Sequence, residues 1–330
     1  MGGTLAAIAA ILLSAGTGAV APALAPAGDG TPGPAPTARS ASAAPAAAGT
    51  LPGGTEIKLP CAPPLDTELR YSRTQVEESA KGRKVNSIDI KVRFRREGGG
   101  YRMWTKIELP GAPAALLAQA PVRILVQPIE FRVSEAGEIS GLVDEPGYWR
   151  GVDSIMDSYA KLIAPEARER QVLLGLYEGM RRLPDETRIG MIARNVAPIL
   201  SFCGLEGDIG DVWTAGREEV SLPIAGLPKL VREQQITFVG ATDTEAYLQV
   251  TTGFDKAAFK RVIEALMAMG PDKDGRPARS QSIPEVSQSV DATVARATGL
   301  TVSYVERSAA GPDAGTGEAG SKTLTLQLRP

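Results

Sequence analysis

The chain has 330 residues, with 36 lysines and arginines, 38 aspartates and glutamates, two cysteines and no histidine. Without histidine, Ser-His and Cys-His catalysis, imidazole metal ligation and a histidine pH switch are all excluded. The net charge of −2 gives no sign of polyanion binding, so no nucleic-acid partner is expected. The length accommodates two domains of ordinary size or one large β-rich domain.

The N-terminal segment has the pattern of an export signal. Residues 5–20 are almost all small or apolar, which suits a signal-peptide core and is short for a membrane span of about 20 residues. No basic residue precedes Arg39, so an alanine-rich tail is the alternative. We expect a signal peptide over 1–27 and a periplasmic or secreted protein with no stable transmembrane span after cleavage.

Alanine, proline, glycine, serine and threonine dominate residues 28–54. Such a composition cannot bury enough apolar surface to offset chain entropy, so it predicts a disordered linker. The folded part is then expected over 55–330, as a single α+β domain in which a degenerate internal repeat is one interpretation.

The two cysteines, Cys61 and Cys203, are far apart in the sequence. In an exported protein an isolated pair predicts a disulfide. Closing a loop of about 140 residues would stabilise the fold by roughly 4–5 kcal/mol. Two buried free thiols and a redox pair are the alternatives, although no C-x-x-C motif is present.

The first part of the folded region reads as strands. Residues 68–77 and 86–96 alternate apolar and polar side chains, and the glycines at 98–100 predict a hairpin turn into a strand over 101–109. Residues 122–133 and 138–143 are expected to form a further strand pair. The hairpins around Gly137 and Gly299 are the basis of the repeat interpretation.

Helical spacing follows in the middle of the chain. Apolar residues from Val152 to Ile163 predict one helix, Pro165 predicts the start of a second, and a third is expected from Pro184 to Cys203 with a kink at Pro198. Strands resume over 212–222, 235–240 and 245–251. A helix capped by Asp255 and strands over 286–296, 300–307 and 322–328 complete the chain. The fold class is therefore α+β, a large antiparallel, curved, half-barrel-like sheet of about eleven strands with a cluster of helices packed on it.

Two short motifs carry a family resemblance. They are Gly210-Asp211-Val212-Trp213 and the hairpin Ala297-Thr298-Gly299-Leu300 that leads into residues 301–304. An exported β-rich chain with these motifs resembles uncharacterised bacterial envelope proteins. Its strand count and covering helices are also similar to the half-barrel fold of the lipoprotein carrier LolA and its mycobacterial lipid-binding relatives. Over about residues 65–328, the resemblance implies an apolar concave face that holds acyl chains.

Catalytic motifs are weak. Ser158 and Lys161 match the Ser-x-x-Lys spacing of penicillin-binding enzymes, in which a lysine activates a serine. The motifs that accompany that pair are missing, so two exposed polar residues are the alternative. The fragment Asp272–Gly275 lacks most of a calcium loop. The carboxylates Glu206, Asp208 and Asp211 are expected to lie in a solvated loop, with a cation site or a carboxylate pair as the alternative. No metal or cofactor is predicted.

A basic face is expected on one strand pair, made of Lys91, Arg93, Arg95, Arg102 and Lys106. It would meet an anionic lipid or glycan, or form a solvated outer face diluted by carboxylates. The three tryptophans, Trp104, Trp149 and Trp213, are expected to pack in the core or at sheet ends.

These observations favour a non-catalytic envelope protein that binds an apolar ligand, a lipid or an envelope protein on its curved sheet. A histidine-free hydrolase or transferase that uses carboxylates or Ser158 with Lys161 is one alternative. A structural or assembly factor without a ligand is the other.

Overall fold

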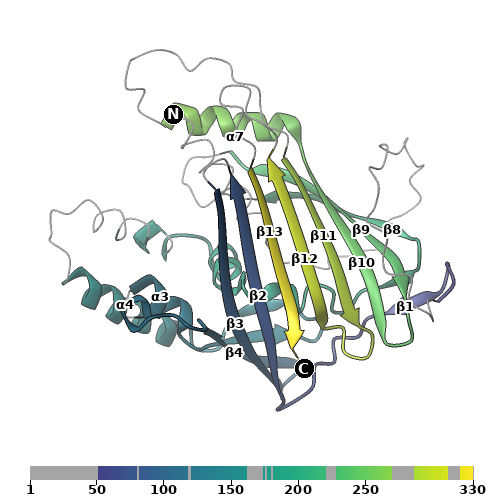
Figure 1. Cartoon of the computed structure of the whole chain (residues 1–330), viewed down its shortest axis with the longest axis horizontal. Helices are drawn as coiled ribbons and strands as arrows, with labels where there is room; N and C mark the ends of the chain where they lie inside the picture. Colours follow the sequence, from purple (N-terminus) through teal and green to yellow (C-terminus); the bar gives the residue numbers. More distant parts are fainter. Residues whose placement is uncertain are drawn as a thin grey trace.

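The structure is a computed structural model that describes residues 51–79, 82–117, 120–161, 174, 177–179, 181–220, 228–269, 286–310 and 320–329. Its main feature is one open, curved antiparallel sheet of eleven strands in the order β6-β5-β4-β3-β2-β13-β12-β11-β10-β9-β8 (Figure 1). The predicted α+β class with a large curved antiparallel sheet is therefore confirmed. The strands are β2 (Glu68–Ser79), β3 (Gly82–Glu97), β4 (Gly100–Glu108), β5 (Ile129–Ser134), β6 (Ile139–Leu142), β8 (Val212–Val220), β9 (Leu230–Ala241), β10 (Glu245–Phe254), β11 (Val286–Ala295), β12 (Thr301–Ala310) and β13 (Gly320–Arg329).

The pairing of β2 with β13 joins the two halves of the chain at the middle of the sheet. Nine residues of β13, from Ser321 to Arg329, pair with Glu78 to Arg70. Figure 1 shows the last strand lying beside the first long one. All other neighbours in the large sheet are consecutive strands in the sequence, so this one pairing fixes the order of the whole sheet.

Alternation along each strand gives the sheet two different faces. On β3, Ile90, Val92 and Phe94 are fully buried, and the residues between them point the other way. We call the face that carries these buried residues the inner face and the opposite one the outer face. Neighbouring strands continue this division, since residues directly opposite in the register share a face.

Two short strands make a separate sheet. β1 (Glu56–Lys58) pairs with β7 (Glu206–Asp208), and both have three residues. Leu59 and Leu205 continue the contact, since the Leu59 amide donates to the Leu205 carbonyl at 2.8 Å. The sequence pattern did not predict either strand, because three residues are too few to show alternation.

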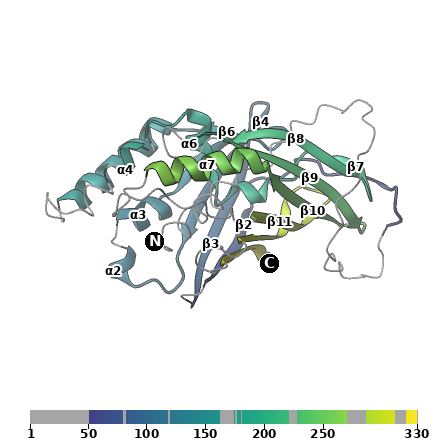
Figure 2. The ribbon, with the colours of Figure 1, turned by 90° about the horizontal axis from the view of Figure 1, so that it is seen from above.

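The described residues include five α-helices and one short 3-10 helix. They are α2 (Ala114–Leu117), α3 (Ala120–Val126), α4 (Glu145–Ala160), α6 (Asp185–Ala193), α7 (Lys256–Met269) and η1 (Ala197–Ile199). Helix α7 lies beyond the ends of β2, β13, β12 and β11 (Figure 1), and the view from above shows it running across the molecule at this end (Figure 2). None of the described helices combines the length and the apolar character that a membrane crossing requires.

The predicted cap of α7 is confirmed. The Asp255 carboxylate accepts a hydrogen bond from the Ala258 amide at 2.8 Å, which satisfies one of the free donors at the helix start. Ala258 and Val262 are fully buried and Phe259 almost so. Phe259 also contacts Phe254 at the end of β10, with ring centroids 6.3 Å apart. The helix is thus anchored directly to the strand that precedes it.

The strand predicted over 122–133 is wrong in its first half. Residues 120–126 form α3, and β5 begins only at Ile129. Pro121 suits the first turn of a helix, because its missing amide would be unpaired there anyway. The run from Val122 to Val126 also does not alternate as a half-buried strand does. Pro128 then separates the helix from the strand.

The helix predicted from Pro184 to Cys203 is also wrong in its second half. α6 ends at Ala193, and only the short η1 follows. Pro198 removes a backbone donor and would clash with the preceding turn, so the helix ends before this proline instead of continuing through it with a kink. The expected second helix from Pro165 lies largely outside the described residues.

The segment after this break packs on the inner face. Ile199 and Phe202 are fully buried, and Cys203 and Leu205 are almost so. Thr301 on β12 donates from its hydroxyl to the Pro198 carbonyl at 2.7 Å, which ties η1 directly to the sheet. Residues 195–205 therefore form part of the core that covers the sheet.

Candidate functional site

A row of six polar side chains crosses the inner face of the sheet. The register places them directly opposite one another on six neighbouring strands, so that they form one line perpendicular to the strands. We call this line the polar row. Its members, from β2 to β9, are Glu77, Lys322, Ser308, Gln288, Thr252 and Gln234.

One neighbouring row on the same face is mostly apolar. It contains Leu324, Val290, Val250 and Ile236, all at most 7% exposed, together with the polar residues Gln75 and Glu306. Four members of the polar row are buried as well, since Gln234, Thr252 and Gln288 are 8% exposed and Ser308 is 2% exposed, while the other two are half-buried. Buried polar groups destabilise a fold unless they are hydrogen-bonded, so a line of them next to a good apolar core needs a reason.

Glu306 lies at the centre of this polar region, on β12. It is 2% exposed and accepts hydrogen bonds from Gln288 at 3.0 Å and from the Tyr304 hydroxyl at 3.2 Å. The Ser308 hydroxyl lies 3.5 Å from the same carboxylate. Burial raises the pKa of Glu306, although the positive charge of Lys322 and these hydrogen bonds oppose the rise.

Replacing Glu306 by glutamine is expected to stabilise the protein at pH 7. Because burial raises the pKa of Glu306 in the folded state, protonation favours the fold, and that contribution is lost as the pH rises through the folded-state pKa. Glutamine mimics the protonated form. Glu306→Gln should therefore unfold at a higher temperature than the wild type at pH 7, with the difference shrinking near pH 4. A lower unfolding temperature of the variant at pH 7 would contradict the burial argument.

Two cations, Arg73 and Lys322, act on this carboxylate, and a third, Arg194, acts on both of them. Arg73 on β2 and Lys322 on β13 are half-buried on the inner face, and Arg194 follows α6 and is exposed. Burial and then the positive charge of Arg194 lower the pKa of Arg73 to about 10. Burial also lowers the pKa of Lys322, and the charges of Arg73 and Arg194 act in the same direction against Glu306 and Glu77. We call Arg73, Lys322 and Arg194 the inner basic cluster.

The inner basic cluster has few partners among the described residues. Arg73 donates one long hydrogen bond, of 3.4 Å, to Gln75, and its buried Nε has no partner there. No described carboxylate lies within 4.0 Å of the Lys322 ammonium. Glu77 accepts a hydrogen bond from Gln75 at 2.7 Å. The polar region thus holds more positive charge than its close contacts neutralise.

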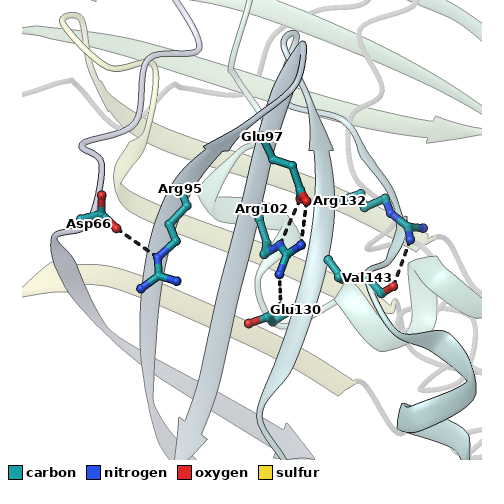
Figure 3. Close-up of polar contacts among 7 residues, drawn as sticks. All are labelled: Asp66, Arg95, Glu97, Arg102, Glu130, Arg132 and Val143. Atoms are coloured by element: carbon teal, nitrogen blue, oxygen red, sulfur yellow. Dashed lines mark hydrogen bonds and ion pairs between the residues drawn. The ribbon is translucent and has the colours of Figure 1, made fainter.

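The five residues of the predicted basic face lie on the outer face of β3 and β4. The register places Lys91 opposite Lys106 and Arg95 opposite Arg102. Each of the five has a carboxylate nearby. Figure 3 shows Arg95 directed at Asp66, 3.1 Å away, and Arg102 between Glu97 and Glu130.

The remaining members of the basic face are paired in the same way. Lys91 and Lys106 contact Glu108 at 2.8 and 3.3 Å, and Arg93 lies 3.6 Å from Glu68 and over the Trp104 ring. On neighbouring β5, Arg132 donates to the Val143 carbonyl at 3.0 Å (Figure 3). Such exposed pairs contribute little stability, about 0–1 kcal/mol each. The outer face is therefore a mixed-charge surface, whereas the inner basic cluster lies beside an apolar core.

Ser158 and Lys161 are both exposed at the end of α4. The Ser158 hydroxyl donates to the Ser154 carbonyl, one turn earlier, at 2.7 Å. This geometry uses the hydroxyl proton within the helix and does not direct it to a base. The structure gives no contact between the two side chains.

Cys61 and Cys203 are brought side by side. They are free thiols that are not at disulfide distance, so the predicted disulfide is not present in the structure. Both lie against Gly137, where an added Cβ would meet the two sulfur atoms at 3.0 and 3.1 Å. The hydrogen bond between the thiols lowers the pKa of Cys61, and the same bond together with burial raises the pKa of Cys203.

The two motifs behind the family resemblance have packing roles. Trp213 follows a turn at Gly210, and its ring packs against Phe238 with centroids 4.9 Å apart. Gly299 adopts a positive φ of 70° and lies so close to Pro60 that a side chain would clash.

Trp149 is packed between Arg181 and Arg188. Within the described ranges, no group of three possible metal ligands is found, and Asp272 and Asp274 lie outside them.

Sequence reasoning missed the polar row and the inner basic cluster. The signal was present in part, because polar residues occupy the apolar phase at one end of several strands, as Gln234 does before Ile236 and Phe238. Only the register between strands shows that these positions form one line, and register is not visible in a single strand.

Comparison with known proteins gives little. No family model matches the chain, and no curated protein matches it. Among solved structures, a domain assigned to an outer membrane lipoprotein-sorting protein from Vibrio parahaemolyticus is similar, with 10% identity and a TM-score of 0.16 over 79% of this chain and 85% of that chain. At this TM-score the likeness carries no argument about function.

Proposed function

We propose that the inner face of the large sheet binds an amphiphilic ligand, with the apolar rows taking its hydrocarbon part and the polar row its polar group. The observation that carries this proposal is the polar row itself, six polar side chains in register on the inner face, four of them buried, beside a row that is mostly apolar. Ligand sites have this composition, a mostly apolar lining with a few placed polar groups.

A purely structural role explains the polar row less well. Apolar side chains at the same positions would extend the core and avoid the burial of donors and acceptors. Within the described part of the polar row, the side-chain hydrogen bonds that cross strands run from Gln288 to Glu306 at 3.0 Å and from Gln234 to Thr252 at 3.4 Å. A ligand with polar atoms would supply further partners.

The proposed role is binding without catalysis. Ser158, the only nucleophile that the sequence suggested, is exposed and donates to a backbone carbonyl. The absence of histidine in the whole chain removes the commonest general base. Export to the periplasm or out of the cell is part of the proposal, and rests on the apolar N-terminal segment over 5–20.

In an oxidising compartment we propose that Cys61 and Cys203 form a disulfide. A disulfide-bearing oxidant would accept two electrons, and the two thiols would release two protons as the S–S bond forms. The pair is close enough to hydrogen-bond, so only a local shift is required. Non-reducing mass spectrometry of the exported protein after thiol blocking should find no blocked cysteine; two blocked cysteines would refute the bridge.

Native mass spectrometry tests the proposed binding. The purified full chain is mixed with the neutral amphiphile 1-palmitoylglycerol below its critical micelle concentration. We expect a saturable adduct of one ligand per chain. A distribution of adducts that only follows ligand concentration, or no adduct, would remove the proposal.

A matched pair of variants places the ligand. Gln288→Leu removes one member of the polar row, and Gln327→Leu makes the same change on the exposed outer face of β13. Losing one hydrogen bond of about 1 kcal/mol should weaken binding roughly fivefold in Gln288→Leu and leave Gln327→Leu unchanged. Equal affinity in both variants would place the ligand elsewhere.

A further inference from the structure

We infer that the polar group of the ligand is an oxyanion, a phosphate or carboxylate carried by the amphiphile, and that the inner basic cluster binds it. This inference rests on the proposed function and specifies the chemistry of its ligand. It depends on the placement of Arg73 and Lys322 near one end of the polar row, where their donors face the inner side of the sheet.

The register brings two of the cations to neighbouring strands. Lys322 lies opposite Glu77 on β2, and Arg73 lies opposite Leu326, four residues along the same face of β13. Leu324 lies between them on β13, and Glu306 lies opposite Leu324 on β12. Arg73 and Lys322 therefore flank a small area of the inner face whose single buried carboxylate is Glu306.

Some hydrogen-bond donors in this area have no partner among the described residues. The buried Nε of Arg73 has no partner among the described residues, and the Lys322 ammonium has no described carboxylate within ion-pair distance. Glu306 is already held by Gln288 and Tyr304. An arginine and a lysine with free donors at a half-buried position match the oxygen atoms of a phosphate or carboxylate.

Arg194 adds an exposed positive charge to the cluster. It is exposed, unlike Arg73 and Lys322, yet its charge acts on both of them. A cation that faces solvent and lies near two half-buried ones would attract an anion toward the inner face. The outer basic face differs, because each of its five cations already has a carboxylate partner.

The test compares three ligands with the full-length protein by isothermal titration. Palmitoylglycerol phosphate carries both the chain and the oxyanion, 1-palmitoylglycerol carries only the chain, and glycerol 3-phosphate carries only the oxyanion. We expect palmitoylglycerol phosphate to bind at least tenfold more tightly than either of the others, as charge-assisted hydrogen bonds allow. Added salt should reduce this preference.

Four variants then locate the oxyanion. Lys322→Gln and Arg73→Gln should each reduce the preference for palmitoylglycerol phosphate over 1-palmitoylglycerol about tenfold. Glu306→Gln should increase this preference, because a nearby negative charge is removed. Lys106→Gln removes the same charge from the outer face and should have no effect. Since Glu306→Gln is expected to act in the opposite direction, a loss of folding in the other inner variants cannot imitate the full pattern.

The outcomes separate the inference from the proposed function. Equal binding of the two palmitoyl ligands, unchanged in Lys322→Gln and Glu306→Gln, would overturn the oxyanion site and leave amphiphile binding intact. If glycerol 3-phosphate bound as tightly as palmitoylglycerol phosphate, the site would be one for a free phosphate compound, and the proposal of an amphiphilic ligand would be overturned. No binding of either palmitoyl ligand would overturn the proposed function as well.

Discussion

Replacing Phe202 by alanine is expected to lower the free energy of unfolding by about 3–5 kcal/mol. Phe202 lies in the segment that follows the break of α6, and its side chain is fully buried in the core over the inner face. Removing the ring loses its transfer free energy and leaves a cavity, because the close-packed surroundings, which include the hydrogen bond from the Thr301 hydroxyl to the Pro198 carbonyl, relax only in part. Urea unfolding followed by circular dichroism measures the change.

Val212→Ala is the control for Phe202→Ala. Val212 begins the edge strand β8 and is 59% exposed, so its truncation should change the stability by no more than about 0.5 kcal/mol. A loss of less than about 1 kcal/mol in Phe202→Ala would contradict the burial of residues 195–205 on the sheet.

Replacing Gly137 by alanine should destabilise the protein by about 2–5 kcal/mol, from two separate causes. Its φ of 88° lies in the left-handed region, which favours glycine. An added Cβ would also lie 2.4 Å from Cys203 Cβ, which requires the hairpin between β5 and β6 to move away from the cysteine pair. Thermal unfolding of the reduced protein measures the effect.

Gly98→Ala separates the two causes. Gly98 also has a positive φ, of 56°, but an added Cβ would meet no atom within 4 Å. Its substitution should therefore show only the conformational part, about 1–2 kcal/mol. If Gly137→Ala and Gly98→Ala were equally destabilised, the close approach of Gly137 to Cys203 would be refuted.

The strands of the sheet were largely predictable from the sequence, and their partners were not. Alternation is a local property, so residues such as Ile90, Val92 and Phe94 reveal β3 without any other strand. The pairing of β2 with β13 joins residues from opposite ends of the folded part, and nothing in either strand specifies it. Two predictions were wrong, a strand at 122–126 where a helix forms and a helix that was expected to continue after Ala193. Both errors arose where a proline changed the local structure.

The candidate site depends on the pairing of the strands, which could not be predicted from the sequence. The basic face on β3 and β4 was visible because its residues are close in the sequence, and the structure places each of them beside a carboxylate. The inner basic cluster combines β2, β13 and the end of α6, which only the folded chain brings together. Cys61 and Cys203 were expected to lie together because they are the two cysteines of the chain, but the structure holds them as free thiols and not as a disulfide.

Tryptophan quenching by a brominated palmitoyl chain tests most directly whether the inner face binds the ligand. Trp213 lies on the inner face at the β8 end of the apolar row, opposite Ile236, and Trp104 lies on the outer face opposite Arg93. Two variants keep one of them each, with the other tryptophans changed to phenylalanine. The account predicts saturable quenching of Trp213 and none of Trp104, whereas equal quenching of both, or quenching of Trp104 alone, would contradict it.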